Sequence, residues 1–137
     1  MNRYDFVSGA VHRETQRRDD GFDLTAAEIY VVEEPGRVDF GGGELASAEL
    51  EAVTTEKREP EDDYGWWSLE TGTYIIEHNE RLATEEQVEV STRPALLERG
   101  AYHPTLRTKE LRKLPLTVLD GGVRIKENAR VSTLRLP

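Results

Sequence analysis

The sequence predicts an all-β fold, a sandwich or barrel of short strands with one short helix. Runs rich in β-branched and aromatic residues, such as TYIIE at 73–77, recur along the chain. Turn residues separate these runs about every 8 to 12 residues, a spacing typical of such folds. Residues 86–92 alternate Val88 and Val90 with charged neighbours, which is the period of a strand. On this pattern alone, a named architecture and a generic small β domain both remain open.

The N-terminal half holds two strand signals and one ambiguous stretch. Residues 1–18 are weakly periodic and end in a basic pair, so we expect an N-terminal arm or a short helix there. Strands are expected at 29–32 and 38–40, on either side of the turn dipeptide Pro35-Gly36. Residues 44–57 suit a helix or a pair of strands, and their β-like flanks favour strands. The polar segment 59–65 is expected to be a mobile loop.

Strand signals dominate the second half. Strands are expected at 66–69, 73–77, 86–92, 114–119, 122–125 and 129–136. Residues 94–99 suit one or two helical turns, with Ser91 or Thr92 as the cap, Pro94 in the first turn and Gly100 at the end. Residues 120–122 (DGG) predict a tight turn between two of the strands.

Length and composition limit the setting of the protein. The 137 residues suit a single domain spanning 1–137. Cysteine is absent, which excludes disulfides and thiolate metal sites and favours a reducing compartment. The first ten residues lack the pattern of a signal peptide, and no stretch approaches the ~20 apolar residues of a membrane span. We therefore expect a soluble, cytoplasmic protein that binds no membrane, and the net charge of −9 argues against duplex nucleic acid as a partner.

Several segments, taken in order, resemble the dUTPase and dCTP deaminase superfamily. GFDLTAAE at 21–28 is similar to the first motif of trimeric dUTPases, and Pro35-Gly36 falls where those enzymes turn a strand. LETGTYIIEHNE at 69–80 resembles a dCTP deaminase pattern in which a glycine turn precedes a strand ending near a Glu. RPALLERG at 93–100 resembles the second motif, Arg-Ser-Ser-Leu with a later Gly, and 122–131 resembles the last barrel strands.

The resemblance covers residues 15 to 136 and implies both a fold and an assembly. The implied subunit is a distorted jelly-roll or β-clip barrel, assembled as a homotrimer. The implied active sites lie between subunits and bind a deoxynucleoside triphosphate with Mg²⁺. The family's chemistry is either water attack at the α-phosphate or deamination of cytosine.

The motif residues that would grip a triphosphate are partly missing from this chain. Arg93 is retained and is suited to pairing with a phosphate, but Pro94 and Ala95 stand where the family has two serines. Proline has no N–H and alanine has no hydroxyl, and each lost charge-assisted hydrogen bond is worth roughly 1.5–3 kcal/mol. The family's Gln in the last motif is replaced by Ser132 or Thr133, depending on the alignment.

The motif that supplies the base for water activation is also altered. Residues 101–114 contain neither the Asp nor the Gly of the family's hairpin, and their only carboxylate is Glu110. A general base has to lie within hydrogen-bond reach of its water, and no pattern in the sequence directs Glu110 inward. The same segment is basic, so Arg107 and Lys109 are candidates for nucleotide contacts, with a solvated hairpin as the alternative.

Three further groups carry two interpretations each. Asp23 either orients metal-bound water, as its family counterpart does, or caps a turn after Gly21. His103 is either an acid or base or, as we expect, a surface residue in a turn. The three histidines lack metal-ligand spacing, so no zinc site is expected. Trp66 and Trp67 are adjacent on a strand, so one should enter the core and the other should face solvent or a partner.

Three functions therefore remain open. The leading hypothesis is a homotrimeric protein of this superfamily with a degenerate site, which acts in a structural, regulatory or ligand-binding role and for which the sequence indicates no certain cofactor. The second is an active, divergent dUTP diphosphatase that uses Mg²⁺ and the residues Asp23, Arg93 and Glu110. The third is a partner-binding module that uses Trp66 or Trp67. The sequence leaves open whether the protein is an enzyme.

Overall fold

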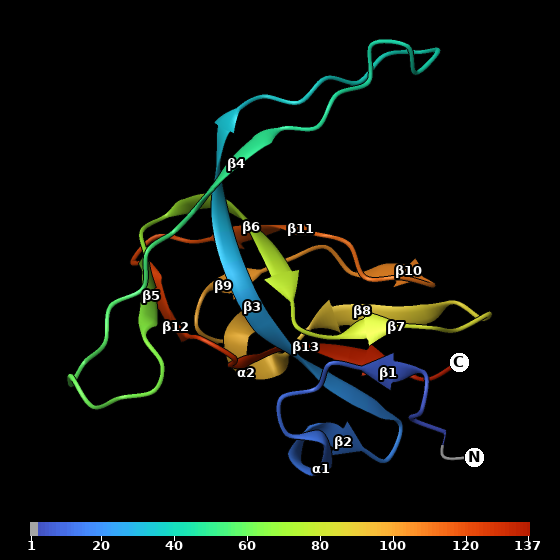
Figure 1. Ribbon diagram of the computed structural model, residues 1–137, viewed down its shortest axis with the longest axis vertical. Helices are drawn as coiled ribbons and strands as arrows, with labels where there is room; N and C mark the ends of the chain where they lie inside the picture. Colours follow the sequence, from blue (N-terminus) through green and yellow to red (C-terminus); the bar gives the residue numbers. More distant parts are fainter. Residues whose placement is uncertain (1–2) are drawn as a thin grey trace.

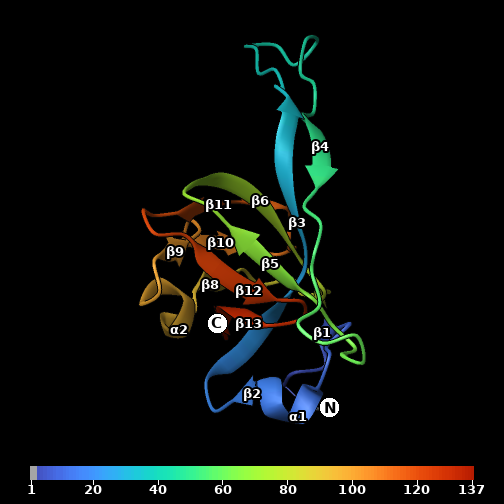
Figure 2. The same cartoon turned by 90° about the vertical axis from the view of Figure 1, so that its left-hand side faces the viewer.

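The computed structural model describes residues 3–137 as a curled, half-open barrel of β-strands (Figures 1 and 2). Its main sheet has nine strands, in the order β10-β8-β13-β3-β6-β11-β9, and β2 and β4 pair with β3 beside this path. Two small sheets, β1-β7 and β12-β5, complete the fold. The strands are β1 (Val7–Ser8), β2 (Arg17–Arg18), β3 (Gly21–Glu34), β4 (Glu49–Ala52), β5 (Trp66–Leu69), β6 (Gly72–His78), β7 (Arg81–Leu82), β8 (Val88–Thr92), β9 (Ala101–Tyr102), β10 (Leu106–Thr108), β11 (Leu114–Val118), β12 (Val123–Lys126) and β13 (Arg130–Arg135). The two short helices are α1 (Arg13–Gln16) and α2 (Pro94–Leu97).

The long strand β3 organises the molecule. Its first half pairs with β2 and β13, and its second half pairs with β6 and β4, with a register shift between Ala26 and Glu28. All six residues from Gly21 to Ala26 are buried, because this half of the strand is covered on both faces. Burial on both faces explains why this segment lacks the alternation of apolar and polar residues that marks a strand with one exposed face.

Two apolar clusters fill the body. One is built around Trp67, whose side chain is fully buried and whose indole N–H donates to the carbonyl of Val53 at 3.1 Å. The other lies under β1, β8 and the first half of β3, and its buried members are Tyr4, Val7, Phe22, Leu24, Val88, Val90 and Leu134. Trp66, in contrast, is half-buried, and the cations of Arg58 and Lys126 lie 5.9 and 5.7 Å from the centre of its ring, so the two tryptophans face opposite ways, as the strand pattern predicts.

A hairpin extends from the body, and we call residues 31–51 the arm (Figures 1 and 2). The expected strand at 38–40 is wrong, because beyond Glu34 the arm is held mainly by an isolated bridge between Arg37 and Ala46. Gly36 allows the two sides of the arm to approach. A Cβ at this position would lie 2.8 Å from the carbonyl oxygen of Ala46.

Most other expected strands are present, with some different boundaries. The expected helix is shorter, at Pro94–Leu97, and its cap is Arg93, which makes no side-chain capping bond. The predicted caps Ser91 and Thr92 are therefore wrong, because both residues are still paired in β8 with β13. Gly100 and Gly121 adopt positive φ values of 92° and 96°, as a helix stop and a tight turn require. Within the described residues, no helix has the length and apolarity to cross a bilayer.

Candidate anion-binding cleft

The candidate site is organised around one buried carboxylate. Asp23 is fully buried in β3, and its Oδ2 atom accepts hydrogen bonds from Arg18 and Arg130, each at 3.3 Å. The Nε atom of Arg93 lies 3.8 Å from the same oxygen. The other oxygen, Oδ1, has no hydrogen-bond partner among the described residues. Asp23 therefore does not cap a turn, as one of the two sequence interpretations held, but is the common anion of three guanidinium groups.

The strand register places these groups together. Thr133 of β13 lies opposite Asp23 on one side and opposite Ser91 of β8 on the other. Arg130 begins β13, and Arg93 follows β8 at the start of α2. Because β2 folds back on the start of β3, Arg18 also reaches Asp23. The antiparallel strands β3, β13 and β8, together with the short strand β2, therefore build the cluster.

A cleft of about 490 Å³ opens beside this cluster. Its lining consists of Arg18, Asp20, Ser91, Thr92, Arg93, Pro94, Ala95, Thr133 and Arg135. The hydroxyl of Thr92 is engaged with the backbone of His103. The side-chain hydroxyls of Ser91 and Thr133 make no such bond with another described residue, so they are available as donors.

The cleft carries an excess of positive charge. Arg18, Arg93 and Arg135 line it and Arg130 reaches the same Asp23, whereas the carboxylates of the region are Asp20, Asp23 and Glu89, which pairs with Arg135 at 3.5 Å. Burial, and then the neighbouring Arg130, lower the pKa of Arg93, because a second cation disfavours the charged form. An anion in the cleft would relieve that repulsion and offer acceptors to planar guanidinium donors.

The residues that depart from the family pattern lie in the same cleft. Pro94 and Ala95 both line it. The cleft therefore lacks, at these two positions, the serine hydroxyls and the backbone N–H that the family pattern supplies. Thr133 lines the cleft, whereas Ser132 is fully buried beneath it. Of the two candidates for the position of the family's Gln, only Thr133 faces a ligand-sized space.

Glu110, Arg107 and Lys109 lie elsewhere. All three are exposed on β10 and the loop that follows it, and Glu110 forms an ion pair with Arg112. They line a separate hollow beside β7, with no residue in common with the cleft at Asp23. Of the five site residues predicted from sequence, the structure places Asp23 and Arg93 together at the cleft and the other three together at the separate hollow.

Arg18, Arg130 and Arg135 are site residues that sequence reasoning missed. A signal existed for two of them, because Arg18 belongs to the noted basic pair and Arg130 lies in the segment resembling the last barrel strands. Neither position marks a ligand site by itself. Only the strand pairing shows that they converge on Asp23.

A second polar cluster is buried behind the cleft, between His78, His103 and Ser132. The Ser132 hydroxyl lies 2.8 Å from Nε2 of His78 and 2.6 Å from Nε2 of His103. His103 is only 3% exposed, so the expectation of a surface histidine is wrong. β13 carries Ser132 between the two rings, which come from β6 and from the loop after β9.

The hydrogen bonds assign the protons in this cluster. Nδ1 of His103 lies 2.8 Å from the carbonyl oxygen of Pro104, which only accepts, so Nδ1 carries the proton. A neutral His103 then accepts at Nε2 from the Ser132 hydroxyl, and Ser132 in turn accepts from an N–H at Nε2 of His78. Nδ1 of His78 is left as a buried acceptor without a partner among the described residues. Burial, and then the neighbouring His103, lower the pKa of His78 to about 4.

A third buried group, Glu80, is satisfied by neighbours rather than aimed at the cleft. Its carboxylate accepts from the side chain of Gln16 at 2.8 Å and from the hydroxyl and the N–H of Thr25 at 2.6 and 2.8 Å. Burial raises the pKa of Glu80, and these bonds lower it in part. The arrangement ties α1 to β3 and has a structural role.

The residues of the cleft do not fit a protein-held Mg²⁺ ion. Magnesium prefers carboxylate oxygens and ordered water, but Oδ2 of Asp23 is surrounded by guanidinium groups. In the part of the chain that the structure describes, no group of three His, Asp or Glu side chains is placed to hold a metal. Any Mg²⁺ at this cleft would have to arrive with its ligand.

Comparisons with known proteins identify the fold. No family model and no curated protein matches the chain. Among solved structures, the crystal structure of 2'-deoxycytidine 5'-triphosphate deaminase from Agrobacterium tumefaciens is similar, with a TM-score of 0.61 and 14% identity. The similarity covers 96% of this chain and 43% of that chain, so the chain spans less than half the length of that deaminase. The chain thus has an all-β, dCTP-deaminase-like fold, and the fold predicted from the sequence resemblance is confirmed.

Proposed function

We propose that the chain is a ligand-binding protein of dCTP-deaminase-like fold with a degenerate catalytic site. It holds the phosphates of a deoxynucleotide in the cleft beside Asp23 and does not convert the nucleotide. The observation that carries this proposal is the convergence of Arg18, Arg93 and Arg130 on one buried carboxylate at the wall of a cleft with free hydroxyls.

The choice of a phosphate rests on charge and geometry. Guanidinium groups present planar, paired donors that match phosphate oxygens, and Asp23 keeps these groups in place. The hydroxyls of Ser91 and Thr133 add neutral donors along the same wall. The choice of a deoxynucleotide rests on the similar deaminase, whose name gives deoxycytidine triphosphate as its substrate.

The absence of catalysis in this proposal rests on the residues around the cleft. Pro94 and Ala95 supply no side-chain donor, Asp23 is held by three arginines, and Glu110 lies on a different surface. Asp20 is the one carboxylate of the described residues that lines the cleft. A water at the cleft therefore has no general base held in position by the fold, and function follows from the site rather than from the fold.

Binding of dUTP, dCTP and inorganic triphosphate to the full chain, measured by calorimetry with and without Mg²⁺, tests the proposal. Arg93→Gln should weaken binding about tenfold or more, because a charge-assisted hydrogen bond is worth roughly 1.5–3 kcal/mol. Asp23 keeps Arg18 and Arg130 in that variant, so the fold should remain intact. Arg124→Gln, an exposed arginine outside the cleft, is the matched control and should bind normally.

Turnover assays separate the proposal from the rival hypothesis. We expect neither pyrophosphate nor ammonia from dUTP or dCTP at high protein concentration. Robust turnover that disappears in Asp23→Asn would establish the divergent diphosphatase instead. Failure of all three anions to bind, or equal binding by Arg93→Gln and the unaltered chain, would overturn the anion site itself.

We also propose that the chain forms a homo-oligomer, with a trimer as the expected number. The sequence resemblance implies such an assembly. The arm, which leaves the body and exposes apolar side chains, supports it.

A further inference from the structure

The arm carries the most exposed apolar side chains among the described residues. Phe40 is 108% exposed, Val38 89% and Leu45 64%, and no other large apolar side chain of the described part exceeds 54%. Apolar residues gathered in this way mark an interaction surface more often than scattered ones do. A monomer with this arm leaves its strongest apolar anchors in water.

Hydrogen bonds within the arm hold its tip in shape. The carboxylate of Asp39 accepts from the N–H groups of Gly42 and Glu44 at 2.9 and 3.0 Å. Two backbone hydrogen bonds join Arg37 and Ala46, at 2.8 and 3.0 Å. A Cβ built at any of residues 41–43 would meet nothing within 4 Å. The tip is thus shaped in advance, which lowers the entropy lost on binding.

The charge of the arm indicates the kind of surface it fits. Residues 31–51 contain six carboxylates and one arginine, a net charge of −5 within a chain of −9. Such a hairpin favours a basic partner surface, because surfaces of opposite charge attract each other.

The chain itself offers such a surface, which we call the basic segment, residues 106–113. It contains Arg107, Lys109, Arg112 and Lys113 with one carboxylate, Glu110, for a net charge of +3. The segment borders a hollow of about 570 Å³ whose lining includes Leu82 and Ala83. The hollow has room for an aromatic side chain such as that of Phe40.

Both surfaces also have open strand edges. Among the strands that the structure describes, β10 is the last of its sheet and pairs with β8 alone, and β4 pairs with β3 alone. Unpaired edges of this kind are templates for strand addition from another chain. Backbone pairing would therefore accompany the contact between opposite charges.

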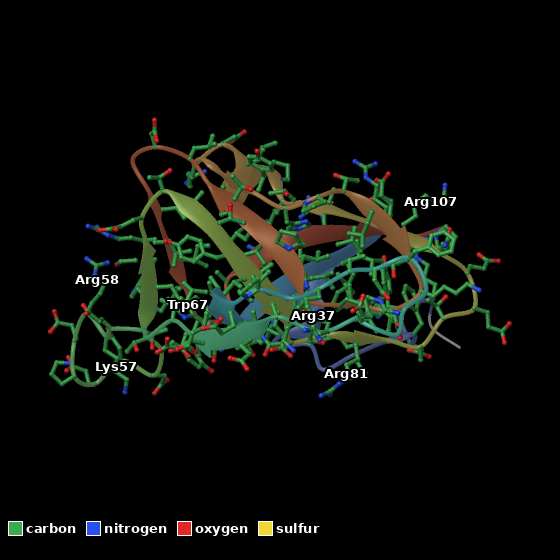
Figure 3. The ribbon with its side chains drawn as sticks, turned by 90° about the horizontal axis from the view of Figure 1, so that it is seen from above. Arg37, Lys57, Arg58, Trp67, Arg81 and Arg107 are labelled. Atoms are coloured by element: carbon green, nitrogen blue, oxygen red, sulfur yellow. The ribbon has the colours of Figure 1, made fainter. Side chains whose placement is uncertain are left out.

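Within one copy, the tip of the arm does not reach the basic segment, although Lys113 at the end of that segment lies 5.7 Å from the centre of the ring of Tyr30, just before the arm. The arm extends beyond the body (Figures 1 and 2), and in the view from above Arg107 lies at the rim of the body, away from Arg37 of the arm (Figure 3). The full exposure of Phe40 agrees with this separation. The contact therefore has to be made between copies.

We propose that the arm of one copy docks on the basic segment and β10 edge of the next copy, with Phe40 in the hollow beside Leu82. Because the two surfaces differ, the contact is head-to-tail, and such contacts close into rings when the rotation between copies permits. This inference refines the homo-oligomer part of the proposed function and does not depend on the phosphate cleft.

Sedimentation velocity over a range of protein concentrations tests the inference. Phe40→Ser combined with Leu45→Ser should weaken assembly about tenfold or more, because exposed anchors at an interface centre carry much of the binding energy. Val11→Ser, an exposed apolar residue on the body, is the matched control and should assemble normally.

A charge exchange identifies the partner surface. Glu34→Lys with Glu44→Lys on the arm, and Arg107→Glu with Lys109→Glu on the basic segment, should each weaken assembly. A chain that carries all four substitutions should assemble again, because its basic arm then meets an acidic segment at every contact, in a ring of any size. Lys57→Glu with Arg124→Glu makes the same charge change as the basic-segment variant at exposed sites elsewhere and should leave assembly unchanged.

The outcomes are distinct. A chain that stays monomeric at all concentrations, or an oligomer indifferent to the arm and basic-segment variants, would overturn the inference. If the arm instead binds a different, basic protein, the chain alone would stay monomeric, and that result would count against the inference. Loss of phosphate binding in Arg93→Gln bears only on the cleft, so the two proposals fail separately.

Discussion

At the scale of single residues, the two buried histidines show how hydrogen-bond chemistry fixes a proton. The carbonyl oxygen of Pro104 can only accept a hydrogen bond, so it fixes the proton of His103 on Nδ1. The Ser132 hydroxyl then donates to His103 and accepts from His78, which fixes the proton of His78 on Nε2. Protonating His78 would place a new N–H at Nδ1, where no described acceptor waits. This missing acceptor and burial act in the same direction on the pKa of His78.

The free energy of unfolding should therefore fall in mild acid. The pKa of His78 is lowered from 6.5 to about 4 in the folded chain, so between those values the unfolded state binds a proton that the folded state refuses. The contribution of His78 to stability is complete above about pH 6.5, is lost as the pH drops toward 4 and levels off below it, with a loss on the order of 3 kcal/mol; the lowered pKa of His103 acts in the same direction. Urea unfolding of the full chain at a series of pH values measures this loss.

His78→Gln provides the matched comparison for this pH effect. Glutamine keeps an N–H near the Ser132 hydroxyl but does not titrate, so the difference between the two proteins isolates His78 from Glu80, whose raised pKa acts with the opposite sign. His12→Gln, at an exposed histidine, should keep the acid sensitivity. Equal pH profiles for the unaltered chain and His78→Gln would contradict the assignment.

At the scale of elements, β3 depends on a glycine at its start. A Cβ on Gly21 would lie 1.9 Å from the carbonyl oxygen of Leu134 on the paired strand β13, and a backbone atom cannot move aside as a flexible side chain can. We expect Gly21→Ala to destabilise the fold by about 1–3 kcal/mol or more, the usual cost of overpacking. Chemical denaturation measures the change.

Gly43→Ala is the control for the strand. Its added Cβ meets nothing within 4 Å, so its effect on stability should be within about 0.5 kcal/mol, as is typical of surface substitutions. If Gly21→Ala proved as mild as Gly43→Ala, the close pairing of β3 and β13 at this end would be wrong.

The elements also show what the sequence can and cannot predict. Strands with strong β-formers, such as those predicted at 73–77 and 114–119, are present, and the side chains that they bury include Ile76, Leu114 and Leu116. β1, β7 and β9 have two residues each, too few for a periodic pattern to be seen. Residues 38–40 have the composition of a strand but lack a pairing partner, and pairing is a property of the tertiary fold.

At the scale of the whole molecule, the fold could be predicted from the order of its motifs, but the site could only partly be predicted. Asp23 and Arg93 lie in recognisable motifs, whereas Arg18 and Arg130 are joined to them only by strand pairing. His103 follows the same rule, because it reads as a turn residue and is buried by Ser132 from another strand. Residues that meet across a sheet are far apart in the sequence, so no motif with a fixed spacing reveals their contact.

The arm should be separable from the rest of the molecule. None of residues 35–48 belongs to either apolar cluster, and Glu34 and Glu49 are paired across the hairpin. Replacing 35–48 with Asn-Gly, a favoured two-residue hairpin turn, should leave the unfolding free energy of the monomer within about 1 kcal/mol. Denaturation at low protein concentration measures this, and a loss of several kcal/mol would show that the arm supports the body.

The continuity of β3 has a mechanical consequence. One strand, from Gly21 to Glu34, begins beside the arginine cluster and ends in the protruding hairpin, bending at its register shift without a break in the backbone. The arm thus has a stiff root instead of a flexible joint. A neighbouring copy bound at the tip would therefore restrict the orientation of the arm and of β3, the strand that carries Asp23.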